Sequence, residues 1–354
     1  MEIIFTKDKY WLEKWDNFVQ TNDKGSHLIL SDWLRSYESY NFDFEVCLCL
    51  ENDLIIGGYG AVIAKILFFK FYVVPYGPIV ASGHENDLNM LIGNVPERAK
   101  KLKACYSHIT LPFSSVLNSH VYTDLPEFDS LRDVNQGHIF KYVYSSNGLN
   151  WVDLKGFDDE AKIMSLKSSI RRNIRSSYRK GLDFEEIETK DKIKEGYQLF
   201  IENSKTSNYN IRGWDEIKEC LFALLEKNVL KMLGVYKNKE LKGAILLLKT
   251  GNYFTYILGG SKKEIPDLRT GDFLQWEAIK ISIKNSFDGY NISLGGSKGV
   301  VEFKNSFNTE QVLFENSKFH WVLNPFIFKM YLIFDQYMKP YKKKIAKILS
   351  MVKI

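Results

Sequence analysis

The sequence predicts an α/β protein made of two copies of one unit, each with a mixed β-sheet flanked by helices. The turn at Asn52-Asp53 joins two apolar strands, and the turn at Asn238-Lys239 does the same in the second half. Around these turns, residues 51–64 and 237–250 align turn for turn. A repeat of this length predicts two similar structural units in tandem.

The first half alternates strands and helices. Ser31 is the expected N-cap of its second helix. The expected strands are 2–5, 44–51, 54–64 and 106–113, and the expected helices are 8–20, 31–40 and 85–103. These elements define a first domain at 1–150.

The second half repeats this order and also ends on a strand that follows a helix. The expected strands are 182–188, 229–237, 240–249, 252–261 and 290–296, and the expected helices are 158–181, 191–205, 214–227 and 271–286. A boundary near 145–157 gives a second domain at 151–319. One expectation for the tail, 320–354, is that it packs back on the first domain.

The composition favours a cytoplasmic globular protein. The 354 residues are 45% hydrophobic, which is enough for a substantial core. The cysteines form no Cys-x-x-Cys pair, and Cys47 and Cys49 alternate with leucines as small buried side chains. The N-terminus has no apolar signal region, and the histidines lack metal-ligand spacing, so no metal site is expected. The apolar run 54–80 contains Lys65 and Lys70, which favours buried strands over a membrane span.

A strongly basic helix begins the second domain. Residues 162–180 hold seven basic residues and no acid. Four of them recur at every fourth position beside an apolar stripe: Lys167, Arg171, Arg175 and Arg179. Cations at this spacing repel one another, so a polyanion contact and an ordinary solvated face are about equally supported.

One loop and one strand carry candidate substrate-binding side chains. Tyr209 and Arg212 lie in the loop before helix 214–227, where an ordinary capping turn is the alternative. Tyr253 and Tyr256 lie on opposite faces of one strand, so one belongs to the core and the other can line a pocket.

Residues 289–307, GYNISLGGSKGVVEFKNSF, place a lysine where stability alone does not require one. Lys304 lies between Phe303 and Phe307, soon after a strand that ends at Gly295-Gly296. The ordinary explanation is an edge-strand lysine that aids solubility.

Three segments together resemble the Fem/FemABX peptidyltransferases and their glycan-cluster relatives. They are KSSIRRNIRSSYRKGL at 167–182, TGDFLQWEAIK at 270–280 and ISLGGSKGVVEFKNSF at 292–307. The resemblance extends in order and spacing over most of the chain, and its most specific part is Gly295 to Phe307. It implies two tandem GNAT-like domains that transfer amino acids from aminoacyl-tRNA to an amine on a cell-wall precursor.

The resemblance also implies roles for single residues. Lys304, beside Phe303, is expected to face the substrates, where a cation stabilises a tetrahedral oxyanion or an acceptor diphosphate. The candidate bases for the acceptor amine are Asp272, Glu277 and Glu302, with loss of the proton to water as the alternative. The donor ester is already activated, so no further cofactor is expected.

Two other functions stay open. The first is an acyl-CoA-dependent N-acyltransferase acting on an amino sugar. The anion-binding loop of acetyl-CoA-dependent GNAT enzymes, Arg/Gln-x-x-Gly-x-Gly/Ala, is one residue short at 269–272, which counts against it. The second is a non-catalytic GNAT-like module in envelope assembly, which a pocket filled by side chains would favour. For the enzyme, the expected partners are aminoacyl-tRNA and a nucleotide- or lipid-linked sugar or peptide acceptor.

The C-terminal segment is a second basic region. Residues 339–354 hold six lysines and no acid, and their apolar residues share one helical face: Ile345, Ile348, Leu349 and Val352. Residues 326–338 are too short and too charged to span a bilayer. We expect peripheral contact with the inner face of the plasma membrane, and a helix docked on the first domain is an equally supported alternative.

Overall fold

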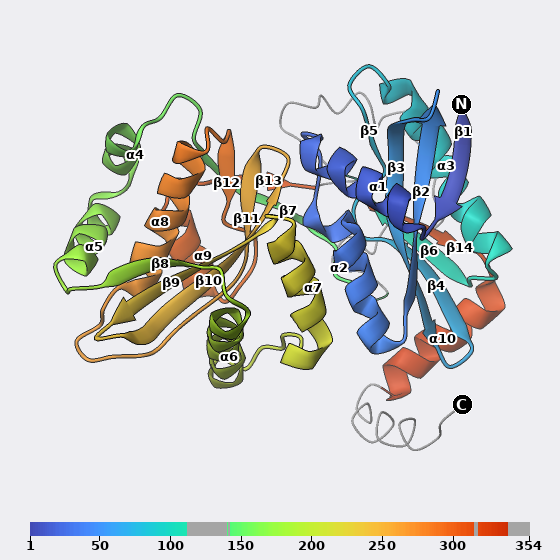
Figure 1. Ribbon diagram of the computed structural model, residues 1–354. Helices are drawn as coiled ribbons and strands as arrows, with labels where there is room; N and C mark the ends of the chain where they lie inside the picture. Colours follow the sequence, from blue (N-terminus) through green and yellow to red (C-terminus); the bar gives the residue numbers. More distant parts are fainter. Residues whose placement is uncertain (112–139, 141, 315–317, 339–354) are drawn as a thin grey trace.

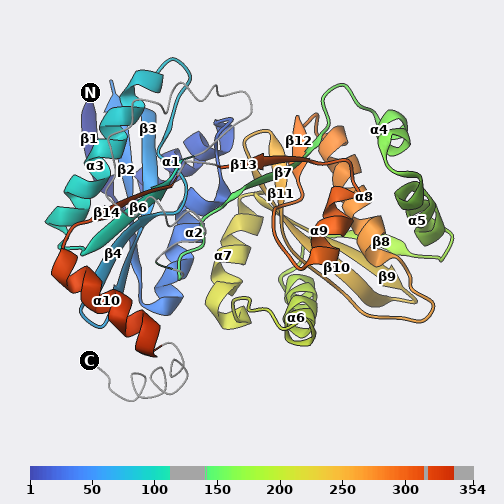
Figure 2. The ribbon, with the colours of Figure 1, turned by 180° about the vertical axis from the view of Figure 1, so that it is seen from behind.

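The computed structural model describes residues 1–111, 140, 142–314 and 318–338. These residues form two mixed β-sheets that stand side by side, with helices on both faces of each sheet (Figure 1, Figure 2). The protein thus has the predicted α/β fold in two tandem units.

The first sheet has the strand order β1-β2-β3-β4-β6-β14, and β5 pairs with β3. Its strands are β1 (Glu2–Thr6), β2 (Asp43–Glu51), β3 (Leu54–Ile66), β4 (Phe69–Val74), β5 (Ile79–Val80), β6 (Tyr106–Thr110) and β14 (Lys318–Val322). Its helices are α1 (Lys9–Thr21), η1 (His27–Ile29), α2 (Ser31–Arg35), η2 (Ser36–Tyr40), η3 (Glu85–Asp87), α3 (Leu88–Lys101) and α10 (Pro325–Met338).

The second sheet has the order β13-β7-β12-β11-β10-β9-β8. Its strands are β7 (Gly148–Asp153), β8 (Asp183–Ile187), β9 (Leu230–Lys237), β10 (Glu240–Thr250), β11 (Tyr253–Ser261), β12 (Gly289–Asn291) and β13 (Glu310–Leu313). Its helices are α4 (Asp159–Ser165), α5 (Ser168–Tyr178), α6 (Lys190–Thr206), α7 (Trp214–Glu226), α8 (Thr270–Lys284) and α9 (Lys298–Asn305).

The two aligned turns have the same backbone conformation. Asn52 and Asp53 have φ values of 48° and 63°, and Asn238 and Lys239 have values of 53° and 64°. Both are left-handed pairs, which two-residue hairpin turns require. The turns therefore set the registers of β2 against β3 and of β9 against β10.

The two halves of the chain exchange one strand each. β7 follows the first domain, yet it pairs antiparallel with both β12 and β13 of the second sheet. β14 follows the second domain, yet it pairs antiparallel with β6 of the first sheet. α10 then packs on the first sheet, where the ring of Tyr331 lies 4.6 Å from that of Phe71. The described part of the tail therefore belongs to the first domain.

One apolar cluster spans both domains. α2 and α7 lie against each other between the sheets (Figure 1), and their buried side chains, such as Leu34 and Leu221, belong to one continuous cluster. Cys47 and Cys49 are fully buried together on the other face of the first sheet, as predicted. In the described part of the chain, no helix combines the length and apolar character needed to cross a bilayer.

Three local predictions are wrong. Helix 158–181 is two helices, because the backbone is extended at Leu166 and Lys167, and Leu166 inserts into the core. The strand expected over 290–296 ends at Asn291, and Lys304 lies on a helix, α9, instead of beside a strand end. Ser31 is not an N-cap, because its hydroxyl donates to Asp16 Oδ2 at 2.7 Å.

Candidate functional site

The site begins where two parallel strands separate. β11 and β12 pair only between Tyr253–Thr255 and Gly289–Asn291, after which β11 continues to Ser261 and β12 ends. α8 connects the two strands, so its N-terminus lies toward this end of the sheet (Figure 1). In open α/β sheets, ligands bind in crevices beyond the carboxyl ends of such strands.

The loop after β12 requires its glycines. Ser293, Gly295 and Gly296 have φ values of 62°, 87° and 122°, in the region that favours glycine. A Cβ on Gly296 would also lie 2.6 Å from a methyl carbon of Val300. Residues 295–300 are exposed, so the backbone of this glycine loop (residues 293–296) is accessible from one side.

Lys304 lies beneath the glycine loop and is buried. Its Nζ donates to the carbonyl oxygen of Ser293 at 3.2 Å, to Ser293 Oγ at 3.0 Å and to the carbonyl oxygen of Gly295 at 3.0 Å. An ammonium group has three donors, and three acceptors surround this one. The amine therefore faces its own loop, and it fixes a backbone that has three left-handed residues.

The buried surroundings of Lys304 lower the pKa of its amine. Burial lowers the pKa of the Lys304 amine to about 8. The ring of Tyr256 lies nearby, with its centroid 5.4 Å from Nζ, a cation–π distance. Burial also raises the pKa of Tyr256, so this phenol stays neutral.

Asparagine side chains that sequence reasoning missed support the same loop. Asn291 Oδ1 accepts from the backbone N–H of Ser293 at 3.0 Å and from that of Asn150 at 3.1 Å. Asn150 Nδ2 in turn donates to Asn305 Oδ1 at 3.1 Å, which ties β7 to α9. The spacing Asn291-x-Ser293 before two glycines was the available signal, because an asparagine typically bonds the N–H two residues on.

Tyr209 extends the site toward the loop between α6 and α7. It lines a pocket of about 270 Å³ formed by residues 201–213 of this region. Tyr209 is close enough to Tyr256 that its charge would raise the pKa of the Tyr256 phenol further. Of the predicted substrate-binding residues, Tyr256 therefore lies beside Lys304, and Tyr209 lies near Tyr256. A larger pocket of about 430 Å³ along α6 is lined mostly by exposed charged side chains, such as Lys194 and Glu195.

Arg212 points to the domain interface. Its guanidinium lies 4.2 Å from the ring centroid of Tyr37 and donates to Ser36 Oγ, both in the first domain. Its carbonyl oxygen accepts from Tyr197 OH at 2.9 Å. The side chain therefore joins the domains, although the residue also lines the Tyr209 pocket.

Phe303 of α9 packs on α8, which carries two of the three candidate bases, whereas the third, Glu302, is exposed on α9. The Phe303 ring packs on Gly271, where an added Cβ would come within 3.4 Å of it. Asp272 and Glu277 are buried and face α5, where they accept from Asn173 at 3.4 Å and from Tyr178 OH. Burial raises the pKa of Asp272.

The predicted basic face lies wholly on α5 and its two caps, after the break at Leu166. Lys167 is the N-cap residue of α5, and its carbonyl oxygen accepts from the backbone N–H of Arg171 at 3.1 Å. Arg171 donates to the carbonyl oxygen of Met164 at 2.6 Å, which holds the break in place. Arg175 and Arg179 are exposed at the outer end of the second domain (Figure 1).

Comparisons with known proteins agree with this architecture. Residues 164–305 match a family model described as an acetyltransferase (GNAT) domain. No curated protein sequence matches the chain significantly. A crystal structure of FemX is similar over 93% of this chain and 99% of that one, with a TM-score of 0.75 and 15% identity.

Two further solved structures have the same arrangement. A conserved protein of unknown function from Bacteroides thetaiotaomicron covers 90% of this chain and 99% of its own, with a TM-score of 0.59 and 14% identity. The C-terminal domain of a putative lysylphosphatidylglycerol synthetase from Agrobacterium fabrum covers 92% and 96%, with a TM-score of 0.55 and 14% identity. Residues 164–305 thus contain a GNAT domain, and the whole chain has the double-GNAT fold of Fem-like proteins.

Proposed function

We propose that the protein is an acyltransferase that moves an aminoacyl group from aminoacyl-tRNA to an amine on a cell-envelope or glycan precursor. The observation that carries this proposal is the exposed glycine loop held from below by Lys304, at the point where β11 and β12 separate. The resemblance of residues 292–307 to the Fem signature selects the donor. The name of the similar lysylphosphatidylglycerol synthetase domain, which joins a lysyl group to a lipid, supports aminoacyl transfer as well.

The chemistry needs a site for developing negative charge. The acceptor amine attacks the ester carbonyl, a C–N bond forms, and the C–O bond to the tRNA ribose breaks. The tetrahedral intermediate carries an oxyanion, which backbone N–H groups and a nearby cation stabilise. The exposed backbone of residues 295–297 and the charge of Lys304 below it supply both kinds of group.

Lys304 acts first as a positioning residue. All three of its donors are engaged in the free protein, so a substrate oxygen reaches the amine only by replacing one acceptor. Ser293 Oγ is the acceptor that rotates away most easily, because it belongs to a side chain. Direct contact between Lys304 and substrate therefore accompanies a change at Ser293.

The proton of the amine has several routes. Asp272 and Glu277 are engaged with α5, and Glu302 is exposed on α9. The leaving ribose oxygen needs one proton, so transfer from the amine to this oxygen through water balances the reaction without a protein base. Arg175 and Arg179 supply exposed charge for the tRNA or for an acceptor diphosphate.

One observation favours acyl-CoA as the donor instead. α8 begins at Thr270, after a left-handed residue, Arg269, and has Gly271 in its first turn, at the end of the sheet where the strands separate. Helix N-termini of this kind bind phosphate groups. The family model that matches residues 164–305 is also named for acetyl transfer.

A donor assay tests both candidates. The protein is incubated with envelope precursors and either charged total tRNA or a set of acyl-CoAs, and loss of each donor is followed with Lys304→Met as the control. We expect acceptor-dependent deacylation of tRNA that the Lys304→Met variant lacks. Acyl-CoA consumption alone would replace the first candidate by the second. Consumption of neither donor would favour a non-catalytic module.

A further inference from the structure

α10 has apolar side chains on two opposite faces. The inner face is buried on the first sheet, where the Tyr331 ring lies 5.5 Å from that of Phe69 and Phe328 stacks on Tyr106. The outer face carries Phe326, Met330, Ile333 and Tyr337, which are 75%, 38%, 49% and 66% exposed. Intervals of four, three and four residues place these four side chains on one stripe.

The turn between β3 and β4 adds two further exposed apolar side chains near α10. Leu67 and Phe68 form its tip and are 43% and 57% exposed. The Phe68 ring lies 4.2 Å from that of Phe69, which in turn contacts Phe334 of α10 at 5.7 Å. Leu67 has a φ of 55°, a conformation that turns normally give to asparagine or glycine. A bulky apolar residue at such a position has a cost in stability, so stability of the turn does not explain it.

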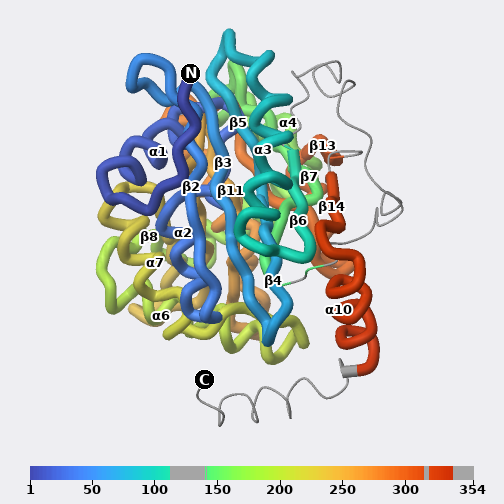
Figure 3. Tube along the Cα trace, turned by 90° about the vertical axis from the view of Figure 1, so that its right-hand side faces the viewer, coloured from blue at the N-terminus to red at the C-terminus, as the bar shows by residue number. Residues whose placement is uncertain are grey.

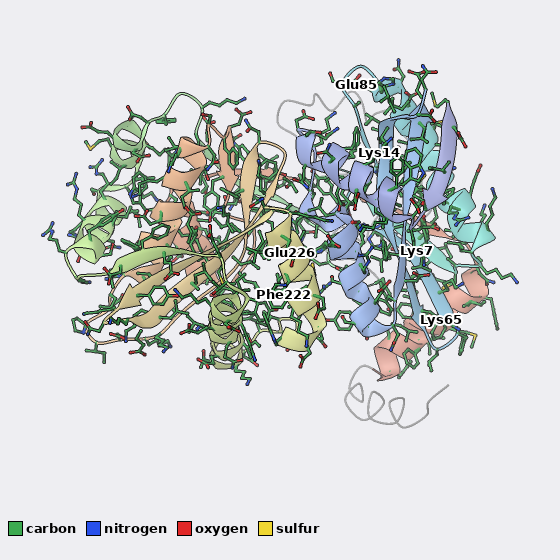
Figure 4. All side chains as sticks on the ribbon, in the orientation of Figure 1. Lys7, Lys14, Lys65, Glu85, Phe222 and Glu226 are labelled. Atoms are coloured by element: carbon green, nitrogen blue, oxygen red, sulfur yellow. The ribbon has the colours of Figure 1, made fainter. Side chains whose placement is uncertain are left out.

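Positive charge adjoins this apolar surface. α10 leads directly into residues 339–354, which contain six lysines and no acid. Lys329 is exposed on α10, and Lys65, labelled in Figure 4, is exposed near the end of β3. Exposed aromatic and aliphatic side chains next to lysines are typical of helices that lie in the plane of an anionic membrane surface.

We infer that the first domain docks on anionic lipid bilayers through the α10 face, defined as Phe326, Met330, Ile333, Tyr337, Leu67 and Phe68. A second copy of the chain fits less well, because a two-fold contact on this face would bring two lysine-rich segments together. The α10 face lies along the outer edge of the first domain (Figure 3), at the opposite end of the molecule from α5 (Figure 1, Figure 2). Docking there leaves the second domain and its glycine loop free, and it does not depend on the chemistry proposed above.

Vesicle binding tests this inference with the full chain. The protein is sedimented with phosphatidylcholine vesicles that contain or lack phosphatidylglycerol, at low and high salt. The test variant is Phe326→Ser with Ile333→Ser, and the matched control is Leu54→Ser with Met90→Ser, which removes two exposed apolar side chains elsewhere in the same domain. We expect binding to the anionic vesicles only, at least about tenfold weaker binding by the test variant, and no change in the control.

A labelled variant reports insertion directly. The native cysteines are all buried, so an environment-sensitive dye on the Ile333→Cys variant marks the α10 face alone. We expect its emission to shift to shorter wavelength with anionic vesicles. Equal binding by test and control variants would overturn the inference. Failure of the parent protein to bind vesicles would also overturn it. If the test variant then loses thermal stability, the chain's own tail covers the α10 face. If the test variant instead dissociates a dimer, a second copy covers it.

Discussion

The amino group of Lys304 lies 3.0 Å from the carbonyl oxygen of Gly295, on the buried side of a loop whose other side is exposed. The same amine holds both oxygens of Ser293. One side chain from α9 thereby fixes the glycine loop after β12. The lysine and the two glycines of the signature therefore form one structural unit, in which the lysine fixes the loop that the glycines allow.

Replacing Lys304 by Met is expected to abolish transfer in a folded protein. The change leaves two partly buried carbonyl oxygens without their lysine donor, which costs about 1–3 kcal/mol of unfolding free energy. Loss of the loop geometry and of the charge is expected to reduce kcat by about 100-fold or more. Urea unfolding and single-turnover transfer measure the two effects.

Two comparisons sharpen this test. Lys304→Arg is also expected to be largely inactive, because a bulky planar guanidinium does not fit three acceptors arranged around a point charge. Lys298→Met, at the exposed start of the same helix, is expected to behave as the parent protein. Normal turnover by folded Lys304→Met would remove Lys304 from the mechanism.

The rate of transfer is expected to fall as the pH rises through about 8. Burial lowers the pKa of Lys304 to about 8, so the amine loses its charge there. Free acceptor amine increases over the same range, so a rate that keeps rising at alkaline pH would contradict a need for the charged lysine. Uncatalysed hydrolysis of the donor ester is subtracted at each pH.

The same pKa predicts a pH dependence of stability. The unfolded chain keeps this proton up to about pH 10.4, whereas the folded protein releases it near 8. Between these values the unfolded state binds more protons, so the contribution of Lys304 to the unfolding free energy rises with pH. Denaturant unfolding of Lys304→Met is expected to lack this rise, and an identical pH dependence in parent and variant would disprove the shift.

Binding of tRNA is expected to depend on Arg175 and Arg179. Reversing both to Glu should weaken binding. It should also reduce the slope of the logarithm of the binding constant against the logarithm of salt concentration by about two or more. Lys100→Glu with Lys101→Glu, on α3 of the first domain, is the control with the same change in net charge. Binding that does not respond to salt would leave α5 as an ordinary solvated face.

Arg212→Met is expected to destabilise the contact between the domains. It removes a cation from the ring of Tyr37 and a donor from Ser36 Oγ, together about 2 kcal/mol. Thermal unfolding is the measurement, and Arg172→Met, on the exposed face of α5, is the control. Unchanged stability with lost transfer would instead support the substrate-binding role predicted from the sequence.

The sequence by itself determined the repeat. Paired left-handed turns, alternating apolar strands and amphipathic helices are local signals, and they placed most elements within a few residues of their observed bounds. The glycines at 295 and 296 were also visible, because a need for positive φ restricts the residue type wherever it occurs.

Only the tertiary structure decided what the side chains face. The charge run at 162–180 indicated one helix, but burial of Leu166 breaks it and leaves Lys162 on a separate helix from Arg171 and Arg175. Arg212 was indistinguishable from a ligand-binding arginine until the first domain placed Tyr37 under it. Lys304 was expected beside a strand, and it is instead a buried helix residue whose acceptors come from a loop nine to eleven positions earlier. Local patterns specify backbone conformation, whereas burial and partner choice depend on contacts between segments far apart in the chain, which no single stretch of sequence contains.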